Sequence, residues 1–158
     1  MTTHRSTSTV GRWQWPSQRW LGEDRVVQVS QEFRGETVDI GAARRLVEDL
    51  FARLLGKGVE VAARIVADVQ LVVSELVTNA VKYTAGPFGV ALLASDAVVE
   101  ITVWDTSTDA VAAMSSDPTR VGRHGLEIVT ALCGELTITA TSAGKQITAQ
   151  MSLHTTAA

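Results

Sequence analysis

The chain has 158 residues, 46% of them hydrophobic and 20% charged, a composition typical of one globular domain with a sizeable core. It is too apolar for a disordered protein, and its uninterrupted apolar runs are too few for a membrane span. The formal net charge of -3 excludes a general attraction to nucleic acid, although it leaves a local basic patch open. Cys133 is the single cysteine, and residues 1–10 lack the apolar run of a signal peptide, so we expect a soluble cytoplasmic protein.

Residues 1–21 differ from the rest of the chain. They are rich in Ser, Thr, Gln and Arg, and they hold three of the four tryptophans, Trp13, Trp15 and Trp20. One interpretation is a loosely docked tail whose indoles cover nearby apolar surface, and this is favoured because termini are often poorly ordered. The other is a partner-docking element, because Trp is enriched at binding hot spots. We therefore divide the chain into a Trp-containing tail, 1–21, and one domain, 22–158.

The first half of the domain predicts one strand and two helices. Loose alternation over residues 26–33 predicts a strand, and helical spacing of apolar residues over 38–56 predicts a helix that Gly56 can end. A longer helix is predicted from about Val59 to Tyr83, before the breaker "AGPFG". Its core-facing stripe is predicted to comprise Ile65, Val69, Val72, Leu76 and Ala80.

The second half predicts strands in pairs. Residues 90–95 and 98–104 form one hairpin, and residues 135–153 form another around residues 142–144. Between them lie a loop, 105–122, long enough to be a functional lid or a disordered segment, and a short helix, 126–134. Because the helices fall between pairs of strands, we expect an α+β fold: a two-layer sandwich with a mostly antiparallel sheet and helices on one face.

Two polar residues interrupt the apolar helix in "LVVSELVTNAVKYT". Glu75 and Asn79 are four residues apart and therefore neighbours, on the flank of the core stripe. A carboxylate at this edge can act as a general base, and the amide oxygen can ligate a hard cation such as Mg2+. From these two residues alone, a solvated helix flank is the simpler interpretation.

Two further stretches have the composition of a binding site. Asp105 ends an apolar strand, where its carboxylate could accept a hydrogen bond from an amine, although Asp, Ser and Thr also favour ordinary turns. Gly122 and Gly125 precede the short helix, where backbone amides can bind phosphate, although a glycine hinge explains them equally well. His4 and His154 lack metal-ligand spacing, which argues against a His/Cys metal site.

The order of these features resembles a known family. "ELVTNAVKYT", "VWDTST" and "GRHGLEIV" look like the N, G1 and G2 boxes of the GHKL ATP-binding superfamily, which includes gyrase-type topoisomerases and sensor histidine kinases. The chain is more closely similar to anti-sigma-factor serine kinases and their actinobacterial regulatory relatives. The resemblance covers about Val38–Leu153 and leaves out the Trp-containing tail.

The resemblance implies a site for ATP and Mg2+. It makes Asn79 the Mg2+ ligand, Glu75 the general base and Asp105 the acceptor for the adenine amino group. It also implies that the loop before the short helix closes over the phosphates as a lid. The other implied cofactor-binding residues are Lys82, Gly122, Arg123, His124, Gly125, Leu126 and Gln146.

The resemblance implies an anti-sigma-type regulator that phosphorylates a serine or threonine of an antagonist protein. Its expected partners are a sigma factor, the antagonist or both, with no nucleic acid and no membrane; a homodimer stays open. Some positions depart from the family pattern: Thr106 and its neighbours replace glycines, Arg123 replaces a glycine, and Gln146 stands where a base-binding threonine is usual. The alternative is a non-catalytic module that binds nucleotide or sequesters a partner. At the adenine position, we expect Asp105→Asn to weaken ATP binding more than folding.

Overall fold

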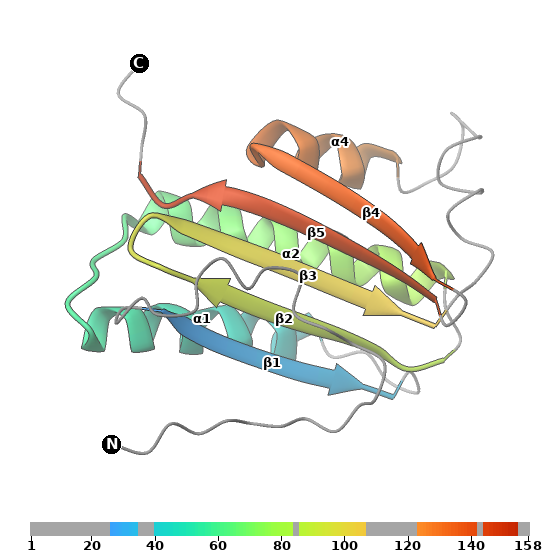
Figure 1. Ribbon diagram of the computed structural model, residues 1–158, viewed down its shortest axis with the longest axis horizontal. Coiled ribbons are helices and arrows are strands. Elements are labelled where there is room, and N and C mark those ends of the chain that lie inside the picture. The colour runs from blue at the N-terminus through green and yellow to red at the C-terminus, as the bar shows by residue number, and fades with distance from the viewer. Residues whose placement is uncertain (1–25, 35–39, 84–85, 107–122, 142–143, 155–158) are drawn as a thin grey trace.

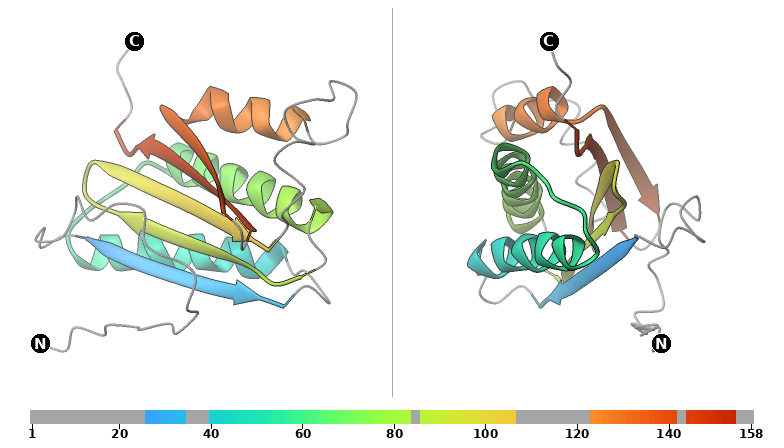
Figure 2. Two further views of the ribbon diagram at one scale, coloured as in Figure 1. Left: turned by 45° about the vertical axis from the view of Figure 1, so that its right-hand side comes forward. Right: turned by 90° about the vertical axis from the view of Figure 1, so that its left-hand side faces the viewer.

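The computed structural model describes residues 26–34, 40–83, 86–106, 123–141 and 144–154, apart from the side chains of 40, 83, 123–126 and 141. Within these residues, five strands form one antiparallel sheet in the order β1-β2-β3-β5-β4, and the helices lie on one of its faces (Figures 1 and 2). The elements are β1 (Val27–Phe33), α1 (Ile40–Gly56), α2 (Ala63–Tyr83), β2 (Phe88–Ala94), β3 (Val98–Asp105), α4 (Arg123–Leu132), β4 (Glu135–Thr141) and β5 (Gly144–Ser152). The predicted α+β architecture is confirmed.

The main boundary error concerns the link between the first two helices. α2 begins at Ala63, so the predicted start near Val59 is wrong. The cause is the end of α1, where Gly58 has a φ of 82° and donates its N–H to Leu55 at 2.9 Å, while Val59 donates to Leu54 at 2.9 Å. These two bonds form a Schellman motif, which ends a helix with a left-handed residue and sends the next residue away from the helix axis.

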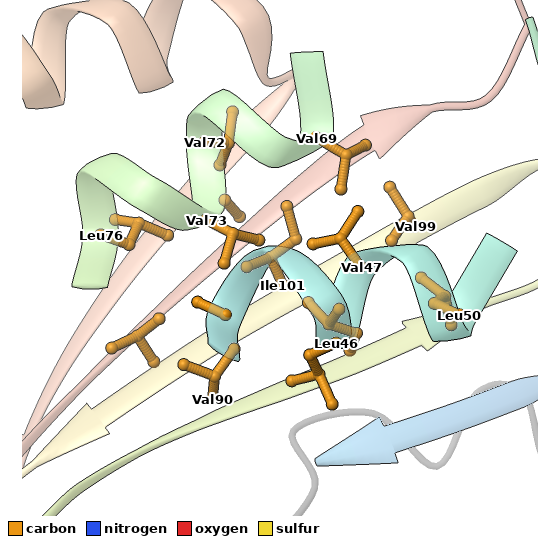
Figure 3. Close-up of a cluster of buried hydrophobic side chains, with 14 of the residues drawn as sticks. Leu46, Val47, Leu50, Val69, Val72, Val73, Leu76, Val90, Val99 and Ile101 are labelled. Carbon is orange, nitrogen blue, oxygen red and sulfur yellow. The ribbon is translucent and has the colours of Figure 1, made fainter. Parts of the chain in front are cut away.

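The core lies between the helices and the sheet. The apolar stripe predicted on α2 is buried throughout, and Leu46, Val47 and Leu50 of α1 meet it from the neighbouring helix (Figure 3). Val90, Val99 and Ile101 close the core from the sheet (Figure 3). Burial of apolar side chains on this scale is the dominant stabilising contribution to a fold of this size.

The register of the sheet determines which side chains share a face. Phe33 pairs with Phe88, Phe88 with Asp105, and Asp105 with Lys145, so these four residues form one row across the strands. Successive side chains of a strand point to opposite faces. Because Phe33 and Phe88 belong to the core under the helices, the whole row faces the helices.

No helix among the described residues is long and apolar enough to cross a membrane. The Trp-containing tail, the loop predicted as a lid and Gly122 lie outside the described residues.

Candidate functional site

Four chain segments meet at one end of the molecule. The C-terminal end of α2, the last residue of β3, the first residues of β5 and the start of α4 all lie at the end where β3 terminates (Figures 1 and 2). α2 contacts both β3 and α4. The fold therefore gathers at one end the three sequence stretches that were singled out separately.

A buried ion pair lies at this end of the sheet. Lys145 Nζ is 3.1 Å from Asp105 Oδ2, and the two side chains are only 1% and 2% exposed. The two residues are direct cross-strand partners, so the pairing of β3 with β5 brings them together. Charged groups are seldom buried without a partner, because the loss of hydration is costly. The pair thus holds the Asp105 carboxylate in a fixed place on the helix side of the sheet.

Gly144 lets β5 begin against the end of β3. A Cβ at this position would lie 1.9 Å from the Asp105 carbonyl oxygen, and the residue has a φ of 147°, which L side chains rarely adopt. Glycine is therefore required here by both space and backbone conformation. On the other side of Asp105, Phe88 stacks on Phe33 with ring centroids 5.0 Å apart, so the carboxylate has an apolar neighbour as well as a charged one.

Glu75 and Asn79 occupy the flank of α2, as their spacing predicts. Asn79 is 6% exposed, whereas Glu75 is half-buried, so the pair spans the boundary between the core and solvent. Ser74 and Thr78, one residue before Glu75 and Asn79 respectively, form a second polar stripe along α2. Their hydroxyls donate to the carbonyls of Gln70 and Ser74, both at 2.7 Å, and are thereby satisfied within the helix. Asn79 is the polar residue of α2 that is buried at the edge of the core, one turn after half-buried Glu75.

The backbone at the start of α4 is suited to binding an anion. α4 begins at Arg123, three residues earlier than predicted, so Gly125 lies inside its first turn rather than before it. The N–H groups of the first turn of a helix have no partner within that helix, and among the described residues they belong to residues 123–125. Together with the helix dipole they favour a negatively charged ligand, phosphate included.

The structure places two of the other predicted nucleotide contacts differently. Lys82 lies in the last turn of α2, at the same end as Asn79, and is exposed, so it stays a predicted contact. Gln146 pairs with Trp104, and the indole of Trp104 lies over Gly89 on the sheet face away from the helices. Strand alternation therefore places Gln146 on the opposite face from Asp105. The residue beside Asp105 on the helix side is Lys145, one position before Gln146, which the resemblance made a cofactor-binding residue.

Lys145 is thus a residue of the site that sequence reasoning missed. A signal was available, because Lys145 continues the inward alternation of Ile147, Ala149 and Met151 in the last strand. A lysine in a core-facing series indicates a buried partner, because an unpaired ammonium is seldom buried.

Comparison with known protein families gives a match. A family model described as a histidine kinase-like ATPase domain matches residues 34–151, which span every described helix and the strands β2 to β5 up to Met151, but leave out β1. A comparison with individually curated proteins finds no match.

Proposed function

Because the chain belongs to the histidine kinase-like ATPase domain family, we propose that it binds ATP with Mg2+ at the end of the sheet that holds Asp105. The observation that carries the proposal is the buried pair of Asp105 and Lys145. It provides a carboxylate of fixed position. The C-terminal part of α2, which carries Asn79, and the start of α4 lie toward the same end of the fold (Figure 1).

Asp105 would recognise the adenine amino group. A carboxylate has two oxygens and about four lone-pair sites, so the ion pair with Lys145 is compatible with a further hydrogen bond from an amine. Phe88, the cross-strand neighbour of Asp105, adds an apolar surface suited to a base. The proposed role of Lys145 is to hold the carboxylate in position before the nucleotide arrives.

Asn79 would ligate Mg2+, and the first turn of α4 would bind the phosphates. Mg2+ is commonly held by one or two protein ligands together with substrate phosphates, so a single buried amide oxygen fits this role. Backbone amides at a helix start bind phosphate without needing a charged side chain. When bound, the metal would neutralise negative charge between the phosphates.

Beyond nucleotide binding, we propose a regulator of the anti-sigma type that phosphorylates a serine or threonine of an antagonist protein. Half-buried Glu75, one turn before Asn79, supports this role. Glu75 would take the hydroxyl proton while the hydroxyl oxygen bonds to the γ-phosphorus and the bond to the ADP oxygen breaks. The proposed partners are a sigma factor, the antagonist or both.

The second candidate is a module that binds nucleotide or sequesters a partner without transferring phosphate. The observation in its favour is Thr106, which follows Asp105 where the family usually has glycines. Its hydroxyl donates to the Pro87 carbonyl at 3.2 Å, which ties the start of the loop to the beginning of β2. A tethered loop has less freedom to rearrange than a glycine-rich one.

Calorimetric titration with ATP, with and without Mg2+, tests the binding site. We expect Mg2+ to increase the affinity of the parent, and we expect this increase to disappear in Asn79→Ala, because the cation loses its protein ligand. Thr78→Ala is the matched control, since that hydroxyl bonds only to its own helix. An Asn79→Ala protein that binds Mg-ATP as well as the parent would remove Asn79 from the site.

Transfer of radiolabelled phosphate to a candidate antagonist tests the chemistry separately. Glu75→Gln should keep ATP binding and lose transfer, because an amide cannot accept the hydroxyl proton. Full transfer by the variant would rule out Glu75 as the base. Binding without transfer in the parent, across the antagonists tried, would favour the non-catalytic module.

A further inference from the structure

The sheet face opposite the helices is more buried than a solvent-facing face should be. By register and alternation, this face of β2 and β3 carries Gly89, Ala91, Leu93, Glu100, Thr102 and Trp104. We call it the outer face. The described helices all lie on the other side (Figure 2). An antiparallel sheet covered on one side normally exposes polar residues on the other.

Three side chains of the outer face are nevertheless almost inaccessible to water. Glu100 is 2% exposed, Thr102 is 1% exposed and Leu93 is 6% exposed. Neighbouring strands supply some contacts, since Gln150 donates to Glu100 at 3.0 Å and the hydroxyls of Thr102 and Thr148 lie 3.2 Å apart. Side chains stand roughly perpendicular to a sheet. Residues on the neighbouring strands can therefore contact the sides of a glutamate or a leucine, but they do not shield its end from water.

We propose that the N-terminal segment, residues 1–25 of the same chain, covers the outer face and packs its tryptophans against β2 and β3. The register of β1 places the C-terminal end of this segment beside the outer face. β1 starts at Val27, opposite Ala94, and the next row on the outer face runs from Gln28 through Leu93 to Glu100. The segment therefore joins the sheet next to two of the buried outer-face side chains.

The segment is long enough and apolar enough for this role. Twenty-five residues can span up to about 80 Å when extended, whereas five strands are only about 20 Å across. Its large apolar residues are Val10, Trp13, Trp15, Trp20 and Leu21. It also carries four arginines, at positions 5, 12, 19 and 25. Arginine and indole N–H groups both donate hydrogen bonds, which suits a face that buries the Glu100 carboxylate.

Other parts of the chain fit less well. Residues 107–122 leave β3 at Asp105, the end of the strand away from Glu100, and they lead into α4 on the helix side. Residues 155–158 are Thr, Thr, Ala and Ala, which offer little apolar surface. The partner that this face fits is therefore the chain's own N-terminal segment, and a second protein could occupy the face only by displacing it.

Acrylamide quenching of tryptophan emission tests the proposal in the full chain. A Trp104→Phe background leaves only the three tryptophans of the segment. We expect quenching in the native protein to be severalfold weaker than in denaturant, because docked indoles are shielded from the quencher. Ala91→Arg, which forces a long charged side chain into the middle of the outer face, should raise quenching severalfold. Ser30→Arg, on the same row but exposed on β1, should not.

Each result of the quenching experiment either supports or overturns the proposal that residues 1–25 cover the outer face. Native quenching as strong as in denaturant, or shielding that survives Ala91→Arg, would overturn the proposal. Shielding that disappears on dilution, with a matching fall in molecular mass, would show that a second copy covers the face and would overturn it as well. If Ala91→Arg does not fold, Ser can replace Trp13, Trp15 and Trp20 in the full chain. Binding of a dye specific for apolar surface should then rise, and unchanged binding would refute the proposal.

Discussion

Replacing Asp105 with asparagine tests the buried ion pair directly. The side chain keeps its size but loses its charge, so the Lys145 ammonium, whose side chain is 1% exposed, loses the carboxylate 3.1 Å away. The new amide can turn its oxygen toward Lys145, but a neutral acceptor compensates a buried ammonium less well than a carboxylate does. The substitution therefore affects both the folded state and any ligand bound at Asp105.

The magnitude can be worked out from the geometry. At 3.1 Å and an effective dielectric constant of about 20, two unit charges attract by about 5 kcal/mol. The cost of desolvating both charges offsets much of this, but removing one partner of a buried pair typically costs about 3–5 kcal/mol. A lost charged hydrogen bond to adenine costs about 1.5–3 kcal/mol, or roughly tenfold or more in affinity. Because the pair is buried, we expect Asp105→Asn to lower the stability of the fold by more than it weakens ATP binding. This is the reverse of the order that we expected from the sequence.

Urea unfolding of four proteins measures the effect: the parent, Asp105→Asn, Lys145→Met and the double variant. Each single variant should lose about 3–5 kcal/mol of unfolding free energy, a large share of the roughly 5–15 kcal/mol typical of a domain. The double variant should lose clearly less than the sum, because neither charge is then buried alone. Asp49→Asn is the matched control: its pair with Arg53 is also 3.1 Å long but exposed, so it should cost about 0.3–0.5 kcal/mol.

Two results would refute this reasoning. One is an Asp105→Asn protein no less stable than Asp49→Asn, which would mean that burial adds nothing to the strength of the pair. The other is additivity, in which the double variant loses the sum of the two single losses.

Three further predictions concern single residues. Gly144→Ala should lower the free energy of unfolding by about 2 kcal/mol or more, measured in urea, because its φ of 147° is strained for alanine and the new Cβ meets backbone at the end of β3. Gly89→Ala should lower the melting temperature because its Cβ would lie 2.3 Å from the Trp104 ring, while Gly134→Ala, with open space around it, should not. Burial raises the pKa of the Cys133 thiol from 9.0 to about 11, so alkylation at pH 8 should be about 100-fold slower in folded than in unfolded protein. The same shift implies stability that is complete below about pH 9 and is lost as the pH rises toward about 11, a loss that Cys133→Ala should remove. Equal alkylation rates in the folded and unfolded states would contradict the shift.

Local sequence patterns predicted most of the fold because the information they carry is itself local. The stripe from Ile65 to Ala80 has helical spacing, and every member is buried in the structure. The start of α2 was predicted too early because apolar residues continue through Val59, whereas the left-handed turn at Gly58 determines the boundary. Helical periodicity carries no information about such a cap.

The candidate site was predicted less completely, because part of it depends on pairing between distant strands. Asp105 could be identified from its place at the end of an apolar strand. Its partner depends on the register between β3 and β5, and a shift of one residue moves each side chain to the other face. One residue separates Gln146, which the resemblance made a cofactor-binding residue, from Lys145, which the structure places beside Asp105.

The same register has a kinetic consequence. The hairpins β2–β3 and β4–β5 each join neighbouring segments of the chain, but the β3–β5 pairing joins distant residues such as Thr102 and Thr148, 46 positions apart. Non-local pairings form slowly because the intervening chain must first be closed into a loop. Asp105 and Lys145 are cross-strand partners in this pairing, so they meet only when β3 and β5 pair. A chain with both hairpins and all its helices, but with β3 and β5 still apart, would match the native protein in most secondary structure and lack the ion pair. Recovery of ligand binding during refolding should therefore lag behind recovery of helical circular dichroism.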